Sequence, residues 1–463
     1  METIHIYHTN DVHSHFENWP QISRLVRDKR REHTDAGEAF FLFDIGDHVD
    51  RSHPFTEGTK GKGNVFLLNE AGYDAVTIGN NEGITMSKKA LSSLYDEAEF
   101  DVVVGNLVDE NGEFPKWAVE SIIYETSKGT KIGVIGATAL YTQFYATLGW
   151  KISPPLEQLR AVAEKLAPVT DIIICLSHMG VTEDESLAVE CPVIDVILGA
   201  HTHHLFQEGE FVGNTLLAAT GKFGAYTGHV TIHFNPTEKR ITEKQATLYS
   251  TETLPVNEED VQRLEKLMQS GKKSMGEQVF YNPSPLKQNL FGPSSLSNFL
   301  GRAILDYSGA DCAMFNAGIF LGSLESGWVT KETMHSLLPH PINICVITLS
   351  GAELLEVYEL SLNEDWPEIK VKGLGFRGEH MGAMIHERLY KNKQGTLIIG
   401  NREVEPNETY TLATLDMFTF GFFFPALQHA EKEYYMPELI RDIASNYGRE
   451  YFKESSVPSE HNL

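Results

Sequence analysis

Short clusters of polar residues recur along this sequence, and each follows a short apolar run. They contain imidazole, carboxylate and amide groups, which bind divalent metal ions in proteins. Imidazole nitrogen suits zinc, iron, manganese or nickel, and carboxylate or amide oxygen suits manganese and magnesium as well. The clusters are Asn10-Asp11-Val12-His13, Gly46-Asp47, Gly79-Asn80-Asn81-Glu82, Ser177-His178 and Gly199-Ala200-His201-Thr202-His203. Their residue types predict a site for a pair of divalent metal ions.

The spacing within the clusters supports the same prediction. Asp11 and His13 are two positions apart, so on an extended segment both side chains point to the same side. His201 and His203 repeat this spacing. The single carboxylate of Asp47 can bridge two ions through its two oxygens. Each motif alone is also typical of an ordinary turn or surface histidine, but their recurrence in this order indicates a metal site.

The apolar runs before the clusters have the length of β-strands, and helical patterns separate several of them. Strands that alternate with helices predict an α/β layered domain. Ligands of open α/β sheets bind outside the carboxyl ends of the strands, so the polar clusters are expected to converge on one edge. Thr182 and Glu185 predict a capping box for a helix over Glu183–Glu190. The expected strands are Ile4–Tyr7, Ala39–Phe43, Ala75–Ile78, Val102–Val104, Ile132–Ile135, Ile172–Leu176 and Val193–Leu198.

A helical pattern over Asn257–Ser270 divides the sequence. Asn257 is a candidate N-cap, and the apolar residues of the segment form one stripe. We interpret this helix as the bridge between two domains; an ordinary surface helix of one large domain is the alternative. The predicted organisation is a metal-binding domain over residues 1–250, a linker helix over 251–279 and a mixed α+β domain over 280–463.

Composition excludes several classes of partner. The 463 residues correspond to two or three domains of about 150 residues each. The net charge of −26 argues against nucleic acid, whose binding proteins need a basic surface, and against an anionic membrane. A membrane span needs about 18 consecutive apolar residues, and no apolar run in this sequence is that long. Neither nucleic acid nor a membrane is therefore an expected partner, and the sequence leaves the oligomeric state open.

The start of the chain and the cysteines predict a cytoplasmic location. Met1–Asn10 alternates like a strand and lacks the basic start and apolar stretch of a signal peptide. None of the four cysteines forms a Cys-x-x-Cys pair, and Cys175 and Cys345 lie in strand-like apolar runs. Buried, reduced thiols are therefore expected.

The series Asp-x-His, Gly-Asp, Gly-Asn-x-Glu, His and Gly-x-His-Thr-His resembles the motifs of the calcineurin-like metallophosphoesterases. Within them it resembles the 5′-nucleotidase family, whose members add a C-terminal substrate domain. The resemblance implies an N-terminal β-sandwich flanked by helices, with the site at one sheet edge, followed by an α+β substrate domain. It extends over nearly the whole chain, through the more general motifs Gly309-Ala310-Asp311, Asn316-Ala317-Gly318-Ile319 and Thr348–Leu354.

The resemblance also implies a ligand set for each ion. Asp47 is the expected bridge, and the ions are expected to be Mn, Zn, Fe, Co or Ni. The remaining ligands are Asp11, His13 and His203 for the first ion, and Asn80, His178 and His201 for the second. Two ions about 3.5–4 Å apart clamp the oxygens of an in-line displacement and activate a bound water as the nucleophile. The expected products are phosphate and an alcohol.

The catalytic motif departs from the family. Members of the family read Gly-Asn-His-Glu, in which the His stabilises phosphoryl charge and is oriented by an Asp three residues on. Here these positions are Asn81 and Ile84. Asn81 is the catalytic candidate, as a neutral amide donor to a phosphoryl oxygen. Because loss of one such contact costs about 10²–10³ in rate, slower or differently tuned hydrolysis is expected.

The C-terminal half also departs from the family. Phe320 replaces the Arg of the family's Asn-x-Gly-Ile-Arg, and the Pro-Phe-Gly-Asn segment, whose Phe stacks on the base, reads Pro339-His340-Pro341-Ile342. His340 is therefore a candidate to stack on a base, although with less area.

Two further places are substrate-binding candidates. Arg377 lies in the glycine-rich segment Gly373–Gly378, which lacks the strand–turn–helix context of a dinucleotide fingerprint, and is a candidate to bind phosphate. Phe418 and Phe420 belong to the aromatic run Asp416–Phe424. These rings are candidates to wall a nucleobase site, with a packed core as the alternative.

The predicted function is a dinuclear metal-dependent phosphoester hydrolase. The expected reaction is hydrolysis of a phosphomonoester such as a nucleoside 5′-phosphate. A cyclic-nucleotide phosphodiesterase or a nucleotide-sugar pyrophosphatase is the enzymatic alternative, because these chemistries use the same metal pair. A catalytically silent scaffold that binds metal and nucleotide is the alternative of another class. It stays open because Asn81 and Ile84 replace the family's catalytic His and the Asp that orients it.

Overall fold

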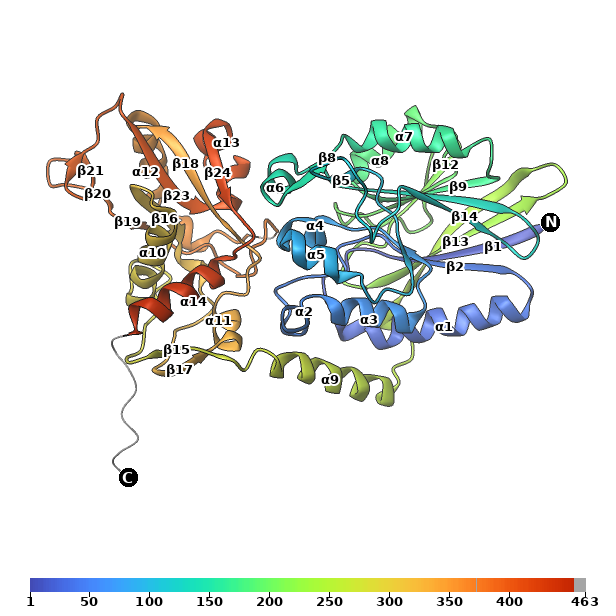
Figure 1. Ribbon diagram of the computed structural model, residues 1–463, viewed down its shortest axis with the longest axis horizontal. Coiled ribbons are helices and arrows are strands. Elements are labelled where there is room, and N and C mark those ends of the chain that lie inside the picture. The colour runs from blue at the N-terminus through green and yellow to red at the C-terminus, as the bar shows by residue number, and fades with distance from the viewer. Residues whose placement is uncertain (372, 454–463) are drawn as a thin grey trace. The chain divides into compact units, whose positions relative to one another are not determined.

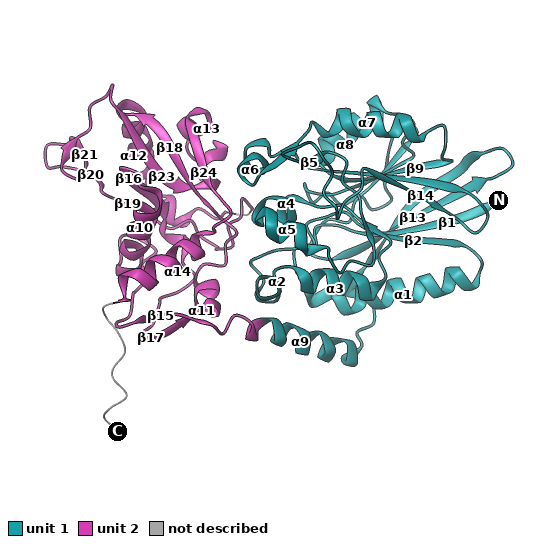
Figure 2. Cartoon of the chain, viewed as in Figure 1, with its two compact units in different colours: residues 1–271 teal, residues 272–463 magenta. Residues whose placement is uncertain are grey.

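The computed structural model describes residues 1–371 and 373–453 (Figure 1). The described residues divide into two compact units, at Gly271 (Figure 2). Helix α9 (Glu258–Lys273) spans this division within the predicted linker. Its start is capped as the sequence indicates, because Asn257 Oδ1 accepts the Asp260 N–H at 3.1 Å.

The first unit contains two mixed sheets. In one, strands β1 to β4 run parallel, β13 pairs antiparallel with β1, and β14 pairs antiparallel with β13. The order is β14-β13-β1-β2-β3-β4. The bounds are β1 (Glu2–Thr9), β2 (Ala39–Asp44), β3 (Ala75–Val76), β4 (Asp101–Val102), β13 (Tyr226–Asn235) and β14 (Arg240–Ser250).

The second sheet of this unit has a parallel centre and antiparallel edges. Its order is β11-β12-β10-β9-β7-β6, and β7, β9, β10 and β12 are the parallel strands. The bounds are β6 (Ser121–Glu125), β7 (Lys131–Thr138), β9 (Ile172–His178), β10 (Val196–Gly199), β11 (Glu210–Val212) and β12 (Thr215–Ala218), and a separate pair joins β5 (Leu107–Asp109) to β8 (Trp150–Ile152).

The core of the first unit lies between the two sheets. Ile4 and Ile6 of β1 belong to one buried cluster with Val134 and Ile174 of the second sheet, because alternate residues of a strand face the same side. A second buried cluster packs α7 and α8 against the outer face of the second sheet. Helices α1 and α3 follow the opposite side of the sandwich (Figure 1). The predicted β-sandwich flanked by helices is confirmed. The helices are α1 (Trp19–Asp35), α2 (Pro54–Thr59), α3 (Lys62–Ala71), α4 (Asn80–Thr85), α5 (Lys88–Leu94), α6 (Thr142–Thr147), α7 (Pro155–Leu166) and α8 (Val181–Glu190).

The predicted start of helix α8 is wrong. The helix begins at Val181, so Thr182 lies inside it and is not its N-cap. The first backbone donor is instead satisfied from a distant loop, because Thr202 Oγ1 accepts the Val181 N–H at 3.1 Å. A local capping motif cannot reveal a partner twenty-one residues away.

The second unit is a mixed α+β domain, as expected. Its main sheet has the order β19-β16-β23-β18-β24, with bounds Met384–Glu387, Cys312–Asn316, Thr409–Leu415, Ile344–Ser350 and Glu431–Tyr435 in that order. Smaller sheets join β15 (Gln278–Asn282) to β17 (Gly327–Thr330), and β20 (Leu389–Lys391) to β21 (Leu397–Ile399) and β22 (Arg402–Glu403). The helices are α10 (Ser295–Ser308), α11 (Lys331–Leu337), α12 (Gly351–Ser361), α13 (Pro425–His429) and α14 (Ile440–Tyr451).

All four cysteines are buried and free, which confirms the prediction of buried thiols. Among the described residues, no helix combines the length and the apolar character needed to cross a membrane.

Candidate metal centre

The polar clusters follow the carboxyl ends of strands from both sheets. Asn10 comes directly after β1, Asp47 three residues after β2, and Asn80 four residues after β3. His178 is the last residue of β9, and His201 lies two residues beyond β10. The two sheets thus present these clusters at corresponding ends of their parallel strands.

One group of side chains converges around His13. Its Nε2 lies 3.3 Å from Nε2 of His203, 3.7 Å from Oδ1 of Asp11 and 3.6 Å from Oδ2 of Asp47. Oδ1 of Asp11 is also 3.4 Å from Nε2 of His203. Ligand atoms that share an ion at 2.0–2.2 Å lie about 3–3.5 Å apart, so these four residues are spaced for one cation.

A second group meets the other oxygen of Asp47. Oδ1 of Asp47 lies 3.5 Å from Nε2 of His178, and the rings of His178 and His201 have centroids 5.3 Å apart. Ligand atoms of Asp11, Asp47 and His178 all lie within 4.8 Å of one another. One oxygen of Asp47 therefore faces each group, which is the arrangement that a bridging carboxylate requires.

Two buried polar atoms of the second group fit an ion as their partner. Within the described part of the chain, His178 Nε2 and Asn80 Oδ1 have no hydrogen-bond partner, and such atoms are costly unless something pairs with them. His178 Nδ1 is 2.6 Å from the carbonyl oxygen of Ile45. The ring donates its proton there, so the lone pair of Nε2 points into the site, as in other metal-binding histidines.

The ligand-bearing loops have an unusual backbone. Asp11, His13, Asp47, His201 and His203 all have φ between 48° and 71°, which is the left-handed region. The expectation that Asp11 and His13 share a side of an extended segment is therefore wrong. Turns, and not strand alternation, bring these pairs together. Each such residue costs of order 1–3 kcal/mol, and clustering of these costs is typical of functional sites.

Glu82 fixes the loop that carries Asp47. Its carboxylate accepts the backbone N–H groups of Asp47 at 3.0 Å, Val49 at 2.8 Å and Gly79 at 2.8 Å. Burial, together with the negative charge of Asp47, raises the pKa of Glu82 to about 7. Asp47 Oδ1 also accepts the N–H of Asn81 at 2.7 Å. Glu82 thus ties the loop after β2 to the start of α4.

Electrostatics keep Asp11 ionised. Burial alone would raise its pKa, but hydrogen bonds with His13 and His203 hold the pKa below its ordinary value. Asn10 Nδ2 donates to Asp11 Oδ2 at 2.7 Å and to the Gly221 carbonyl at 2.8 Å, which positions the carboxylate.

Tyr141 was not among the predicted site residues. It follows β7, and its ring meets that of His201 edge-on, with centroids 6.0 Å apart. Its position beyond the end of a predicted strand is the signal that would have found it.

Gly79→Ala tests how closely this loop must pack. A Cβ at Gly79 would lie 2.0 Å from Asp47 Oδ1 and 2.5 Å from Asp47 N, so the Asp47 loop must shift. We expect the variant to lose at least one tightly held metal ion, measured by elemental analysis after dialysis. Gly105→Ala is the matched control, because its Cβ would meet nothing closer than 3.4 Å. Equal metal content in both variants would contradict the role of this packing.

Comparisons with known proteins agree with this geometry. Residues 4–205 match the family model of the calcineurin-like phosphoesterases, and residues 277–428 match that of the 5′-nucleotidase C-terminal domain. The chain is 39% identical over 453 residues to the uncharacterized metallophosphoesterase YunD of Bacillus subtilis (strain 168), covering 96% of this chain and 98% of that protein. The chain belongs to the 5′-nucleotidase family of calcineurin-like metallophosphoesterases. It is therefore a hydrolase of phosphoesters, and enzymes of this family use dinuclear metal centres.

Solved structures share the fold over both domains of this metallophosphoesterase. The NAD nucleotidase of Haemophilus influenzae superimposes with a TM-score of 0.64 at 15% identity, covering 98% of this chain and 96% of that chain. The 5′-nucleotidase precursor of Thermus thermophilus gives a TM-score of 0.59 at 17% identity, covering 97% and 96%.

Asn81 of this metallophosphoesterase is held by contacts within the protein. Its Nδ2 donates to the Val49 carbonyl at 3.0 Å and lies 3.0 Å from Nδ1 of His13. One amide proton of Asn81 is therefore used within the protein, and the amide lies against the ring of His13, a metal-ligand candidate. Its contact with a phosphoryl oxygen stays a prediction.

His340 is a structural residue of the second unit. Its ring is fully buried and stacks on Phe376, with centroids 5.1 Å apart and planes at 4°. Nε2–H donates to the Ile319 carbonyl at 2.6 Å, and Nδ1 accepts the Arg377 N–H at 2.8 Å. No surface of this ring is open to a nucleobase, so the predicted stacking role is wrong.

The lowered pKa of His340 in the folded protein predicts that stability depends on pH. Burial, with smaller contributions from Arg377 and Arg441, lowers its pKa to about 3. An unfolded histidine titrates near 6.5, so the stabilisation by neutral His340 is complete above pH 6.5 and declines as pH falls toward 3. We expect the stability difference between the wild type and His340→Gln to shrink by about 1.4 kcal/mol per pH unit below 6.5. Urea unfolding at several pH values measures it, and a constant difference from pH 7.5 to 5 would contradict it.

The other predicted substrate residues have different surroundings. Phe418 is fully buried and packs edge-on against Phe423 and Phe424, so it belongs to the core, as the alternative stated. Phe420 is partly exposed. Arg377 is half-buried, and its Nη1 donates to the Phe376 carbonyl at 3.2 Å. Roles for Phe420 and Arg377 in substrate binding stay predictions.

Proposed function

We propose that this metallophosphoesterase hydrolyses nucleoside 5′-phosphates at a centre of two divalent ions. The observation that carries the proposal is Asp47, whose two oxygens face two separate groups of nitrogen and oxygen ligands. Support for a nucleotide comes from the 5′-nucleotidase C-terminal domain over residues 277–428. The names of the Thermus and Haemophilus proteins, a 5′-nucleotidase and a NAD nucleotidase, point to the same class of substrate.

The proposed ligands divide between the two ions around Asp47. When bound, the pair of ions supplies an activated water and neutralises charge on the phosphoryl oxygens. The first ion would be held by Asp11, His13, Asp47 and His203, and the second by Asp47, Asn80, His178 and His201.

The protein's own contribution is to orient these ligands before substrate arrives. Ile45 fixes the tautomer of His178 through its carbonyl, Asn10 holds Asp11, and Glu82 holds the Asp47 loop. Such supporting contacts are typically worth 10–100-fold in metal affinity or activity. Since the side chain of Asn81 carries no charge, we infer that stabilisation of phosphoryl charge in this site depends more on the ions than in family members that have a histidine at this position.

A phosphodiesterase or pyrophosphatase remains the second candidate, because the Haemophilus relative is named for NAD, which contains a phosphoanhydride. The silent scaffold is disfavoured, since the chain belongs to a family of hydrolases and has candidate ligand clusters.

A substrate panel tests the proposal. Purified protein is stripped of metal and supplied with Mn²⁺, Zn²⁺, Fe²⁺, Co²⁺, Ni²⁺ or Mg²⁺, then assayed with nucleoside 5′-phosphates, 3′-phosphates, cyclic nucleotides, nucleotide sugars and NAD. We expect release of inorganic phosphate to be fastest from 5′-phosphates. Faster cleavage of cyclic nucleotides or of phosphoanhydrides would establish the alternative. Binding without turnover across the panel would contradict the proposal.

We also propose a cytoplasmic location, supported by the four cysteines, which are all buried and free. Cell fractionation with an antibody against the protein tests it, and recovery in the medium would contradict it.

A further inference from the structure

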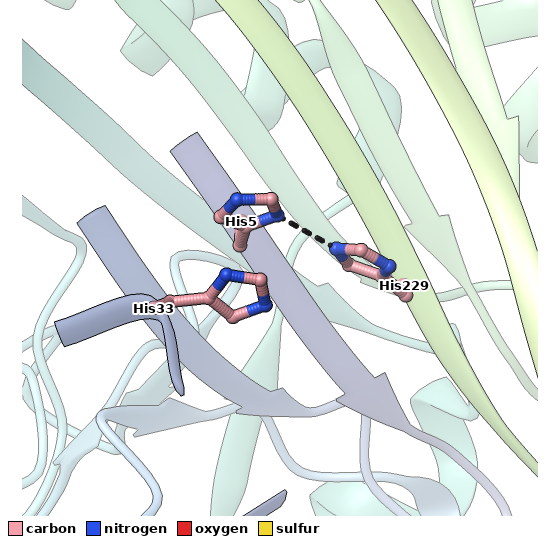
Figure 3. Close-up of side chains that lie close together, drawn as sticks. All are labelled: His5, His33 and His229. Carbon is pink, nitrogen blue, oxygen red and sulfur yellow. Dashed lines mark hydrogen bonds between the residues drawn. The ribbon is translucent and has the colours of Figure 1, made fainter. Parts of the chain in front are cut away.

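A second cluster of histidines lies away from the carboxyl ends of the strands. Alternation along β1 sends Ile4 and Ile6 into the sandwich, so His5 and Tyr7 face the opposite side of the sheet. His229 of β13 pairs with Tyr7 in the register of the two strands. His33, in the last turn of α1, joins them (Figure 3). Three separate elements thus bring three imidazoles together.

Glu38 orients two of these rings. His5 and His33 are stacked, with centroids 3.6 Å apart. Nε2 of His5 lies 3.0 Å and Nδ1 of His33 lies 3.2 Å from the same oxygen of Glu38. An anionic carboxylate accepts only, so both rings place an N–H toward Glu38. Their lone pairs therefore lie on the opposite edge of the stack, at Nδ1 of His5 and Nε2 of His33.

That opposite edge faces the third imidazole. Nδ1 of His5 is 2.9 Å from Nε2 of His229, and the hydroxyl of Tyr7 is 3.2 Å from Nε2 of His33. One nitrogen from each of the three histidines lies within 4.8 Å of the others. Two imidazole nitrogens on one ion at 2.0–2.1 Å lie about 3–3.4 Å apart, close to the spacing of His5 and His229. A carboxylate on the far nitrogen of a ligand histidine is the usual second layer of a metal site.

The rings of His5 and His229 are also in the protonation state that metal binding needs. Burial, with the neighbouring histidines, lowers the pKa of His5, and it lowers the pKa of His229 to about 3. Neutral imidazoles at pH 7 keep a lone pair for a cation.

We propose that His5, His33 and His229 bind a third transition-metal ion, separate from the dinuclear centre. His5 and His229 form the fixed pair. The ring of His33 must tilt to join them, because rings stacked at 3.6 Å direct their lone pairs in parallel. Three nitrogens with a phenol oxygen nearby suit Zn²⁺, Cu²⁺ or Ni²⁺ better than Mg²⁺ or Ca²⁺. Without an ion, the His229 N–H donates to His5 and the same contacts form a hydrogen-bonded core.

The number of metal ions bound per chain distinguishes a metal-binding triad from a hydrogen-bonded core without an ion. Metal-depleted protein is titrated with Zn²⁺ in a calorimeter, and the content after dialysis is measured by elemental analysis. We expect three ions per chain for the wild type and two for His5→Gln and for His229→Gln. His233→Gln, on the same strand β13, is the matched control and should keep three. A wild type that holds two ions, or triad variants that hold as many as the control, would overturn the proposal.

A second measurement tests the triad separately from misfolding of the variants and from failure of the proposed dinuclear centre. In Asp47→Asn protein, Co²⁺ bound at the triad is expected to give the visible absorption of a nitrogen-ligated site, with one equivalent at saturation. Adding His229→Gln should abolish it. Because this readout uses a chain with an impaired dinuclear centre, it does not depend on the proposed function. Absence of a spectrum with an intact thermal unfolding transition would show that the cluster is a hydrogen-bonded core only.

Discussion

Asp47→Asn is expected to lower phosphoesterase turnover by about 10³-fold or more. The substitution keeps the shape of the side chain and an oxygen that can accept the Asn81 N–H. It removes the negative charge and one of the two oxygens that face His13 and His178. Two-ion centres contribute several kcal/mol of transition-state stabilisation, and about 4 kcal/mol corresponds to a factor of 10³. Steady-state kinetics at saturating Mn²⁺, with metal content measured in parallel, checks the result.

Asp195→Asn is the matched control for this variant. Asp195 precedes β10 at the end opposite the metal centre, is half-buried, and accepts the Ile173 N–H at 2.9 Å. The same chemical change there should leave turnover and metal content within about twofold of the wild type, since surface and structural changes away from a site act mainly through stability. Equal losses in both variants would show that Asp47 acts through folding and not through the ions.

Glu82→Ala is expected to destabilise the first unit by about 3 kcal/mol or more. The carboxylate is buried and accepts three backbone N–H groups, from Asp47, Val49 and Gly79. Each buried donor left without a partner costs about 1–3 kcal/mol. The same loss frees the loop that carries Asp47, so metal affinity should fall about 10–100-fold. Urea unfolding of metal-free protein measures the first effect, and calorimetric titration measures the second.

Glu353→Ala provides the comparison for Glu82. Glu353 also accepts a backbone N–H at the start of a helix, from Ser350 at 2.8 Å, but this contact is exposed. Water can replace the lost acceptor there, so a cost of about 1 kcal/mol or less is expected and no change in metal affinity. A Glu82 variant as stable as the Glu353 variant would show that solvent enters the Asp47 loop and satisfies its donors.

The amino-acid sequence by itself determined the candidate ligands and the architecture that carries them. Local patterns were sufficient for this: apolar runs marked the strands, and Asp47, His178 and His201 stood at or beyond their ends. Parallel strands share an edge for their carboxyl ends, so the convergence followed without knowledge of side-chain positions. The buried cysteines followed for the same reason, because Cys175 and Cys345 lie in apolar runs.

Only the tertiary structure decided what each polar side chain contacts. Asn81 is held by Val49, His340 is enclosed by Phe376 and Ile319, and Val181 is capped by Thr202. In each case the partner comes from another element, so no local motif contains it. The left-handed turns at the ligands were likewise invisible, because a non-glycine residue adopts them only where surrounding contacts compensate for the strain.

The histidine cluster shows the same limit most clearly. His5, His33 and His229 lie far apart in the sequence, and no spacing rule connects them. They meet because β1 pairs with β13 in one register and α1 covers that face of the sheet. A shift of one residue in that register would turn the opposing side chains to the other face. The sequence thus determines which chemical groups the chain carries, whereas strand register and packing determine which of these groups lie close together.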